Sequence, residues 1–176
     1  MEACAECGYS YGALRRGEIA PALEARARDF RVVLLGTDAG RLRARPRPGV
    51  WSVLEYACHV RDVLEVQRHR AERAGAEARP DFAPMRREER VTEDGYNDQD
   101  PAAVADRLVA GAGALAGLFD GLDDAGWERT GVYHWPTTEV RTVEWIGRHT
   151  VHEEVHHLLD VGRLLGERVP TTGAWR

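Results

Sequence analysis

The sequence predicts an all-α protein, a four-helix bundle with long crossover loops and a short irregular N-terminal segment. Four segments carry apolar residues at the three- and four-residue spacing of a helix, whereas no convincing set of strands is present. The 176 residues suit one domain with its own core. We therefore expect residues 1–17 to form a separate Cys-x-x-C segment and residues 18–176 to form the bundle domain.

The first helix is expected at about residues 18–35, and the second begins after Trp51. In the first, Pro21 suits the first turn, and the stretch GTDAGRLRARPRPGV then ends the helix with glycine and proline. In the second, Ser52 with a glutamate three residues later matches a capping box. His59 shares its helix face with valines, so its side chain is expected to face the core.

A long polar crossover at residues 75–100 separates the second helix from the third. It contains two prolines and a run of charges, with a helical turn expected at 86–92. Asp100 is then the expected cap of the third helix, with Pro101 at its first position. This helix is rich in alanine and glycine, so another helix can approach it closely, and its apolar surface suggests a homodimer.

A second long loop at residues 123–141, with room for short extended pieces, leads to the fourth helix. Thr142 is expected to open that helix, which runs to about residue 165 and stops at Gly166. The remaining tail to Arg176 is expected to be loosely held.

Composition narrows the classes of function. The net charge of −5 and the pI of about 5.8 argue against binding to nucleic acid or to an anionic membrane. All 24 basic residues are arginine, which excludes chemistry on a lysine side chain. No uninterrupted apolar run reaches about 18 residues, and no signal peptide is recognisable. The odd count of three cysteines favours free thiols, so we expect a cytoplasmic protein.

The fourth helix carries two pairs of side chains that could bind a metal ion. Glu153 with His157, and His152 with His156, each have the i, i+4 spacing that brings two ligands to one ion. A helix turns by about 100° per residue, which places the first pair among apolar residues of this helix. The angular argument therefore favours Glu153 and His157 together with His59, and a shift of one residue would select the other pair.

An ordinary structural role competes with metal binding for these side chains. Histidines on a helix are often solvated, and we expect this for His149, His152 or His156 taken one at a time. A histidine and a carboxylate that lie against apolar residues need partners, however, because burying them unpaired is costly. A shared divalent ion would supply that partner for His59, Glu153 and His157.

Two stretches resemble the signature helices of the DinB-like superfamily, which includes the YfiT-like proteins: WSVLEYACHVRDV (51–63) and RHTVHEEVHHLLDVG (148–162). The resemblance implies a four-helix bundle with one divalent ion, Zn, Ni, Mn or Fe, held by His59, Glu153 and His157. Many members have histidine where this chain has Glu153. A glutamate at this place resembles the branch that contains the mycothiol-dependent maleylpyruvate isomerase.

The resemblance also implies a class of reaction. Relatives use the metal to bind a low-molecular-weight thiol such as bacillithiol or mycothiol, and a cation converts a thiol of pKa about 8.5 to the nucleophilic thiolate. The leading hypothesis is a metal-dependent thiol S-transferase or thiol-assisted isomerase with a small-molecule substrate. The alternatives are a metal-dependent hydrolase and a non-catalytic metal-binding or stress-associated bundle.

Other side chains are candidates for supporting roles. Aspartates near the ligands could orient the imidazoles, namely Asp62 and Asp160. Arginines could orient an anionic cofactor or substrate, namely Arg61, Arg148 and Arg163. Loop residues are expected to form the walls around the substrate, namely Tyr96, Tyr133, His134 and Trp135.

The N-terminal Cys-x-x-C motif is a separate feature. Cys4 and Cys7, followed by glycine and tyrosine, resemble half of a zinc ribbon, but no second such motif is present. The alternatives for them are a structural metal knuckle, within one chain or shared between two, a redox pair, and two free thiols. Cys58 points about 100° away from His59 and is expected to be a small packed residue.

Overall fold

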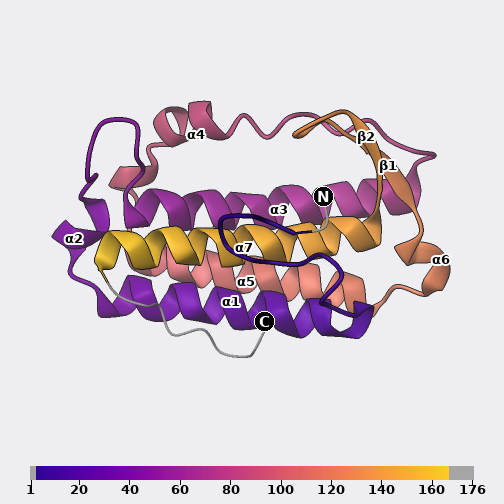
Figure 1. Cartoon of the computed structure of the whole chain (residues 1–176), viewed down its shortest axis with the longest axis horizontal. Helices are drawn as coiled ribbons and strands as arrows, with labels where there is room; N and C mark the ends of the chain where they lie inside the picture. The colour runs from indigo at the N-terminus through magenta and orange to yellow at the C-terminus, as the bar shows by residue number, and fades with distance from the viewer. Residues whose placement is uncertain (1–2, 167–176) are drawn as a thin grey trace.

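The computed structural model describes residues 3–166, in which four long helices pack side by side (Figure 1). The long helices are α1 (Arg16–Gly36), α3 (Val53–Ala76), α5 (Pro101–Asp120) and α7 (Val143–Leu165). The short elements are α2 (Ala39–Arg43), α4 (Arg87–Glu93), the 3-10 turn η1 (Tyr96–Asp98), α6 (Asp124–Trp127), β1 (Thr130–Tyr133) and β2 (Glu139–Thr142). The predicted four-helix bundle is confirmed, whereas the expectation of a loosely held tail lies outside the described residues.

The order of the helices explains the long crossover. α1 and α3 each contact both α5 and α7, so the four helices form a ring around a common core. Ser52, just before α3, donates a hydrogen bond of 2.7 Å to Asn97, just before α5. α3 and α5 therefore start at the same end of the bundle and run parallel. The chain must return along the bundle between them, and residues 77–100 make this return and carry α4 (Figure 1).

The helix ends lie where their capping residues predict them. Ser52 and Glu55 form the complete capping box at the start of α3. The side chains of Asp100 and Thr142 accept hydrogen bonds from backbone N–H groups in the first turns of α5 and α7. Gly166 follows α7 with a φ of +69°, the left-handed conformation that favours glycine.

The start of α1 differs from the prediction. The helix begins at Arg16, so Pro21 lies inside the helix instead of in its first turn. A proline has no N–H to donate to the carbonyl four residues earlier, here that of Gly17. Both residues are exposed, so water can reach the carbonyl that the proline leaves without a partner.

A small antiparallel hairpin forms in the second long loop, where the sequence left room for short extended pieces. β1 pairs with β2 from Thr130 opposite Thr142 to Tyr133 opposite Glu139. The crossover joins the hairpin through the backbone bond from Phe82 N to the carbonyl oxygen of residue 132, 3.0 Å. Gly131 is required there, because an added Cβ would lie 2.2 Å from a ring carbon of Phe82. Strands of four residues leave too short an alternating pattern to be recognised in the sequence.

The N-terminal segment lies across α7 (Figure 1). Tyr9 and Tyr11 are buried, and the Tyr9 hydroxyl donates a hydrogen bond of 2.9 Å to the carbonyl oxygen of Arg148. The Tyr11 hydroxyl lies 2.7 Å from His149 Nδ1. The segment is irregular, as predicted, but its two tyrosines pack it against the fourth helix of the bundle.

α5 is more apolar than the absence of a long uninterrupted apolar run suggested. Among the described residues it is the one helix long and apolar enough to cross a membrane, by length and composition alone. Two of its three leucines, Leu108 and Leu115, and its phenylalanine, Phe119, are buried in the bundle core. A core helix of a bundle has the same length and composition, so the expectation of no membrane partner stays a prediction.

Candidate metal centre

Three side chains predicted to bind a metal ion meet between α3 and α7. His59 projects from α3, and Glu153 and His157 project from successive turns of α7. Glu153 Oε2 lies 3.7 Å from His59 Nε2 and 3.6 Å from His157 Nε2. The potential ligand atoms of the three residues all lie within 4.8 Å of one another. The structure thus brings together the set that the spacing and the resemblance favoured.

The Glu153 carboxylate is the centre of a larger group of imidazoles. Its other oxygen, Oε1, lies 3.7 Å from His149 Nε2 and 3.7 Å from His152 Nδ1. Burial alone would raise the pKa of Glu153, but the nearby rings of His157 and His59 outweigh it and hold the pKa well below its ordinary value. The carboxylate therefore stays ionised, which is the form that binds a cation.

The surroundings of the His59 ring indicate whether a cation fits this cluster. Its side chain is buried, and neither ring nitrogen has a hydrogen-bond partner within residues 3–166. Burial lowers the pKa of His59, so the ring is neutral and keeps a lone pair for a ligand bond. A buried imidazole without partners is costly, and a divalent cation shared with Glu153 and His157 would satisfy it.

Asp160 orients His157, as the sequence suggested. Asp160 Oδ2 lies 3.0 Å from His157 Nδ1, which leaves Nε2 facing Glu153. Although burial favours the neutral ring, Asp160 and Glu153 raise the pKa of His157 to about 9. A cation that binds there must therefore displace a proton. The matching expectation for Asp62 is wrong, because its Oδ2 accepts a 2.6 Å hydrogen bond from the buried Tyr96 hydroxyl.

A pocket of about 290 Å³ opens onto this cluster and is lined by His59, Glu153 and His149. Its other walls come from α3, the crossover and the tip of the hairpin. Tyr133, His134 and Trp135 line it, as expected of these loop residues. Tyr96 does not, because it is fully buried in the core.

The arginines around the pocket are not those expected. Arg61, Arg148 and Arg163 pair with neighbouring carboxylates, those of Asp62, Glu144 and Asp160, and none of the three lines the pocket. Arg70, Arg86 and Arg87 line it instead. Arg70 lies eleven residues after His59, which is three helical turns along the same face of α3. That spacing is the signal that the sequence reading missed.

His152 and His156, the alternative ligand pair, form a group of potential ligands with Cys4 and Cys7, separate from the group at His59. The structure places them on a neighbouring side of α7, where they meet the N-terminal cysteines. A shift of register is therefore not needed to account for four histidines on one helix. His149 lies against the pocket and stacks on Trp145 at a ring distance of 4.5 Å, a contact that the sequence reading did not foresee.

Fold and site together define a helical bundle with a candidate metal centre between two of its helices. The chain belongs to the DinB superfamily, whose family model matches residues 22–161. The family expected from the two signature helices is thereby confirmed. Among curated proteins, no sequence matches the chain significantly.

Two solved structures share the fold. The first is YfiT from Bacillus subtilis, described as a probable metal-dependent hydrolase with an unusual four-helix bundle topology. It is 21% identical to this chain with a TM-score of 0.75, over 86% of this chain and 88% of YfiT. The second is the mycothiol-dependent maleylpyruvate isomerase, 13% identical with a TM-score of 0.69, over 86% of this chain and 62% of that one.

Proposed function

We propose that the protein is a metal-dependent enzyme that activates a low-molecular-weight thiol, such as mycothiol, for S-transfer to an anionic small molecule or for its isomerisation. His59, Glu153 and His157 would hold one divalent ion, Zn, Ni, Mn or Fe. The observation that carries the proposal is the cluster of these three side chains, two of which, His59 and Glu153, line a pocket with arginines in its wall. Three protein ligands leave a coordination position open, which is typical of catalytic sites.

The protein groups around the ion have separate tasks. When bound, a divalent cation would supply Lewis-acid chemistry, lowering the pKa of a thiol or water at its open position. Asp160 orients the His157 ring, and the ionised Glu153 contributes a negative charge to the ligand set. The crossover and the hairpin limit the access of solvent to the cluster, because both contribute walls to the pocket.

The charges in the pocket wall favour an anionic ligand. Arg86 and Arg87 pair with Glu93 and Glu88, but their side chains are 58% and 51% exposed, so they can turn toward a ligand. Arg70 is buried, and it holds the wall together by donating to the Tyr133 hydroxyl at 2.8 Å and to the Ala83 carbonyl oxygen at 2.7 Å. A volume of about 290 Å³ suits a small molecule, at the lower end of typical ligand pockets.

A second candidate function is metal-dependent hydrolysis. His134 lines the pocket, and its Nε2 lies 2.7 Å from Asp81 Oδ1. A histidine paired with a carboxylate can accept a proton from water, which is the general-base role that a hydrolase needs. The likeness to YfiT supports this candidate, and the likeness to the mycothiol-dependent isomerase supports the first.

The test compares two adjacent carboxylates of α7. The purified full-length protein is loaded with Zn, Ni, Mn or Fe. Turnover of an anionic electrophile is then measured with and without mycothiol, and turnover of an ester is measured without thiol. We expect turnover to need both metal and mycothiol, to be lost in Glu153→Gln, and to persist in the control Glu154→Gln.

Ester turnover without thiol, lost in the same Glu153 variant, would replace the proposal with the hydrolase. Bound metal without turnover of either substrate would favour the non-catalytic bundle. If Glu153→Gln binds as much metal as the wild type, the assignment of Glu153 as a metal ligand is overturned.

The expectations of a homodimer and of a cytoplasmic location stay predictions.

A further inference from the structure

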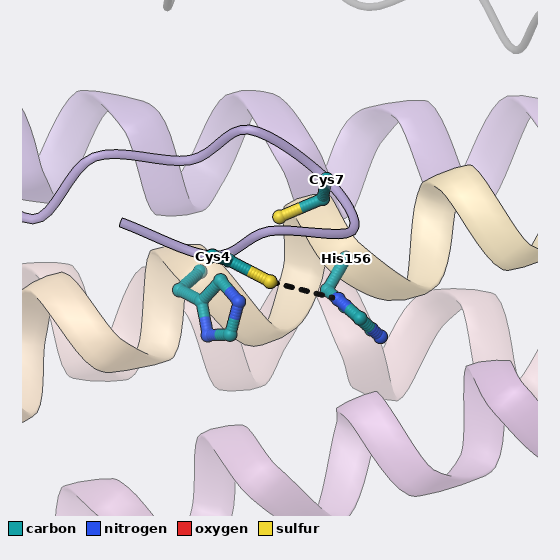
Figure 2. A group of neighbouring side chains, drawn as sticks. Cys4, Cys7 and His156 are labelled. Atoms are coloured by element: carbon teal, nitrogen blue, oxygen red, sulfur yellow. Dashed lines mark hydrogen bonds between the residues drawn. The ribbon is translucent and has the colours of Figure 1, made fainter. Parts of the chain in front are cut away.

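Outside the centre at His59, the structure gathers a second group of metal-ligand side chains. Cys4 and Cys7 of the N-terminal segment face His152 and His156 of α7, and one potential ligand atom from each lies within 4.8 Å of the others. Cys4 Sγ is 3.7 Å from His156 Nδ1. Figure 2 shows the two sulfur atoms directed toward each other and the contact from Cys4 to His156 as a dashed line.

We propose that Cys4, Cys7, His152 and His156 form a structural zinc site that fastens the N-terminal segment to α7. Two thiolates and two neutral imidazoles make the Cys₂His₂ set that structural zinc sites use, with no coordination position left open. Binding of Zn²⁺ releases the two thiol protons to solvent, so the completed site has no net charge. This inference does not depend on the proposed enzymatic function.

The spacing of the donor atoms agrees with a tetrahedral ion. Zn–S bonds of about 2.3 Å and Zn–N bonds of about 2.0–2.1 Å separate a sulfur from a nitrogen by about 3.6 Å in a tetrahedral site. The distance from Cys4 Sγ to His156 Nδ1 is 3.7 Å. The widest pair in the cluster, at no more than 4.8 Å, needs to close by about 1 Å, a movement within reach of a short loop.

The backbone explains why the two cysteines lie close together. The carbonyl oxygen of Cys4 accepts a hydrogen bond of 2.9 Å from Gly8 N, and Cys4 N donates one of 2.8 Å to the carbonyl oxygen of Tyr9. These bonds close a tight loop around Cys7, and Gly8 adopts the left-handed φ of +74° that the turn requires. The i, i+4 spacing of the two histidines on α7 supplies the opposite half of the site.

Both histidines have one nitrogen held by a neighbour and the other available. His152 is buried, its Nδ1 lies 3.2 Å from the Tyr11 hydroxyl, and its Nε2 has no hydrogen-bond partner among the described residues. His156 Nε2 lies 3.5 Å from Glu6 Oε2, which leaves Nδ1 facing Cys4. Zinc-binding histidines typically have their second nitrogen oriented in this way by a hydroxyl or a carboxylate.

A redox or nucleophilic role fits these cysteines less well. A redox pair has no need for two histidines facing it, one of which, His152, has a buried nitrogen without a hydrogen-bond partner among the described residues. A structural ion accounts for all four side chains and for the path of the segment over α7.

The experiment counts ions and identifies the atoms that bind them. We expect two zinc ions per chain in the full-length protein, one in Cys4→Ser/Cys7→Ser and one in Glu153→Gln. With Co²⁺ in place of zinc, the near-ultraviolet sulfur-to-cobalt charge-transfer band should be present in the wild type and in Glu153→Gln. It should be absent from the double cysteine variant. The matched control Cys58→Ser changes the third cysteine, which is fully buried, and should keep both ions and the band.

The wild type alone gives an answer if the double variant does not fold. Zinc should then protect Cys4 and Cys7 from alkylation, as measured by mass spectrometry. Absence of a sulfur-to-cobalt band, alkylation at equal rates with and without zinc, or a Cys4–Cys7 disulfide in protein kept under reducing conditions would overturn the proposal. If the wild type shows the sulfur-to-cobalt band but binds no ion at His59, Glu153 and His157, only the proposed function is contradicted.

Discussion

Two adjacent glutamates of α7 are expected to respond to pH in opposite ways, and Glu154 offers the clearer test. Its side chain is fully buried, and neither carboxyl oxygen has a hydrogen-bond partner among residues 3–166. Burial raises its pKa well above the ordinary value of 4.5, an effect that nearby Arg26 only partly offsets. Glu154 is therefore protonated in the folded protein at pH values where the unfolded chain has released the proton.

The size of the effect follows from proton linkage. Between pH 4.5 and the raised pKa, the folded state binds one more proton than the unfolded state. The free energy of unfolding then falls by about 1.4 kcal/mol for each pH unit as the pH rises. Glu154→Gln keeps the shape of the side chain and removes the titration. The variant should equal the wild type in stability near pH 4 and exceed it increasingly toward neutral pH.

Urea denaturation of both proteins at pH 5, 6 and 7, with a chelator present, measures this difference directly. We expect the advantage of Glu154→Gln to grow by about 1.4 kcal/mol per pH unit over this range, up to the raised pKa. The opposite sign holds for Glu153, whose lowered pKa contributes stability above pH 4.5 that is lost on acidification. Parallel stability curves for wild type and Glu154→Gln would refute the reasoning, because they would mean that Glu154 is ionised in the folded protein.

Three further predictions concern orientation, packing and capping. Asp160→Asn should weaken metal binding at the His59 centre by about tenfold to a hundredfold, measured by competition with a chromophoric chelator, because it loosens the ligand His157; unchanged affinity would contradict the orienting role. Gly131→Ala should lower the free energy of unfolding by about 1–3 kcal/mol, since the new Cβ would meet the Phe82 ring, and an unaltered urea midpoint would disprove that contact. Ser52→Ala should cost at least about 1 kcal/mol, measured the same way, because it removes both the cap of α3 and the hydrogen bond to Asn97, and an unchanged urea midpoint would show that neither contributes.

The long helices could be predicted because their signals are local. Ser52, Asp100, Thr142 and Gly166 each mark a helix end through bonds or backbone angles that involve only nearby residues. Short extended pieces were expected in the second loop, but their pairing into a hairpin could not be predicted, since the strands have four residues each and depend on contacts with the distant crossover. Gly131 illustrates this dependence, because its lack of a side chain makes sense only beside Phe82.

Part of the candidate site could also be predicted from the sequence, and part could not. The i, i+4 spacing on α7 and the core-facing position of His59 were sufficient to select three side chains that the fold brings together. The pocket wall was harder to predict, because Arg86 and Arg87 reach it only through the path of the crossover. The partners of His152 and His156, Cys4 and Cys7, could not be predicted either. They belong to an irregular segment almost 150 residues earlier, and the position of that segment depends on buried tyrosines.

The two clusters also explain the unusual density of histidine on α7. Consecutive residues of a helix point about 100° apart, so the pairs 152/156 and 153/157 serve neighbouring sides of one helix. The clusters touch at Glu153 Oε1, 3.7 Å from His152 Nδ1, and at the Tyr11 hydroxyl, which lies near both His149 and His152. If zinc holds the N-terminal segment in place, it also holds Tyr11 against two of the imidazoles that surround Glu153. Under the two-site proposal, the structural ion thus helps to position the imidazoles of His149 and His152 beside Glu153, which would bind the catalytic ion.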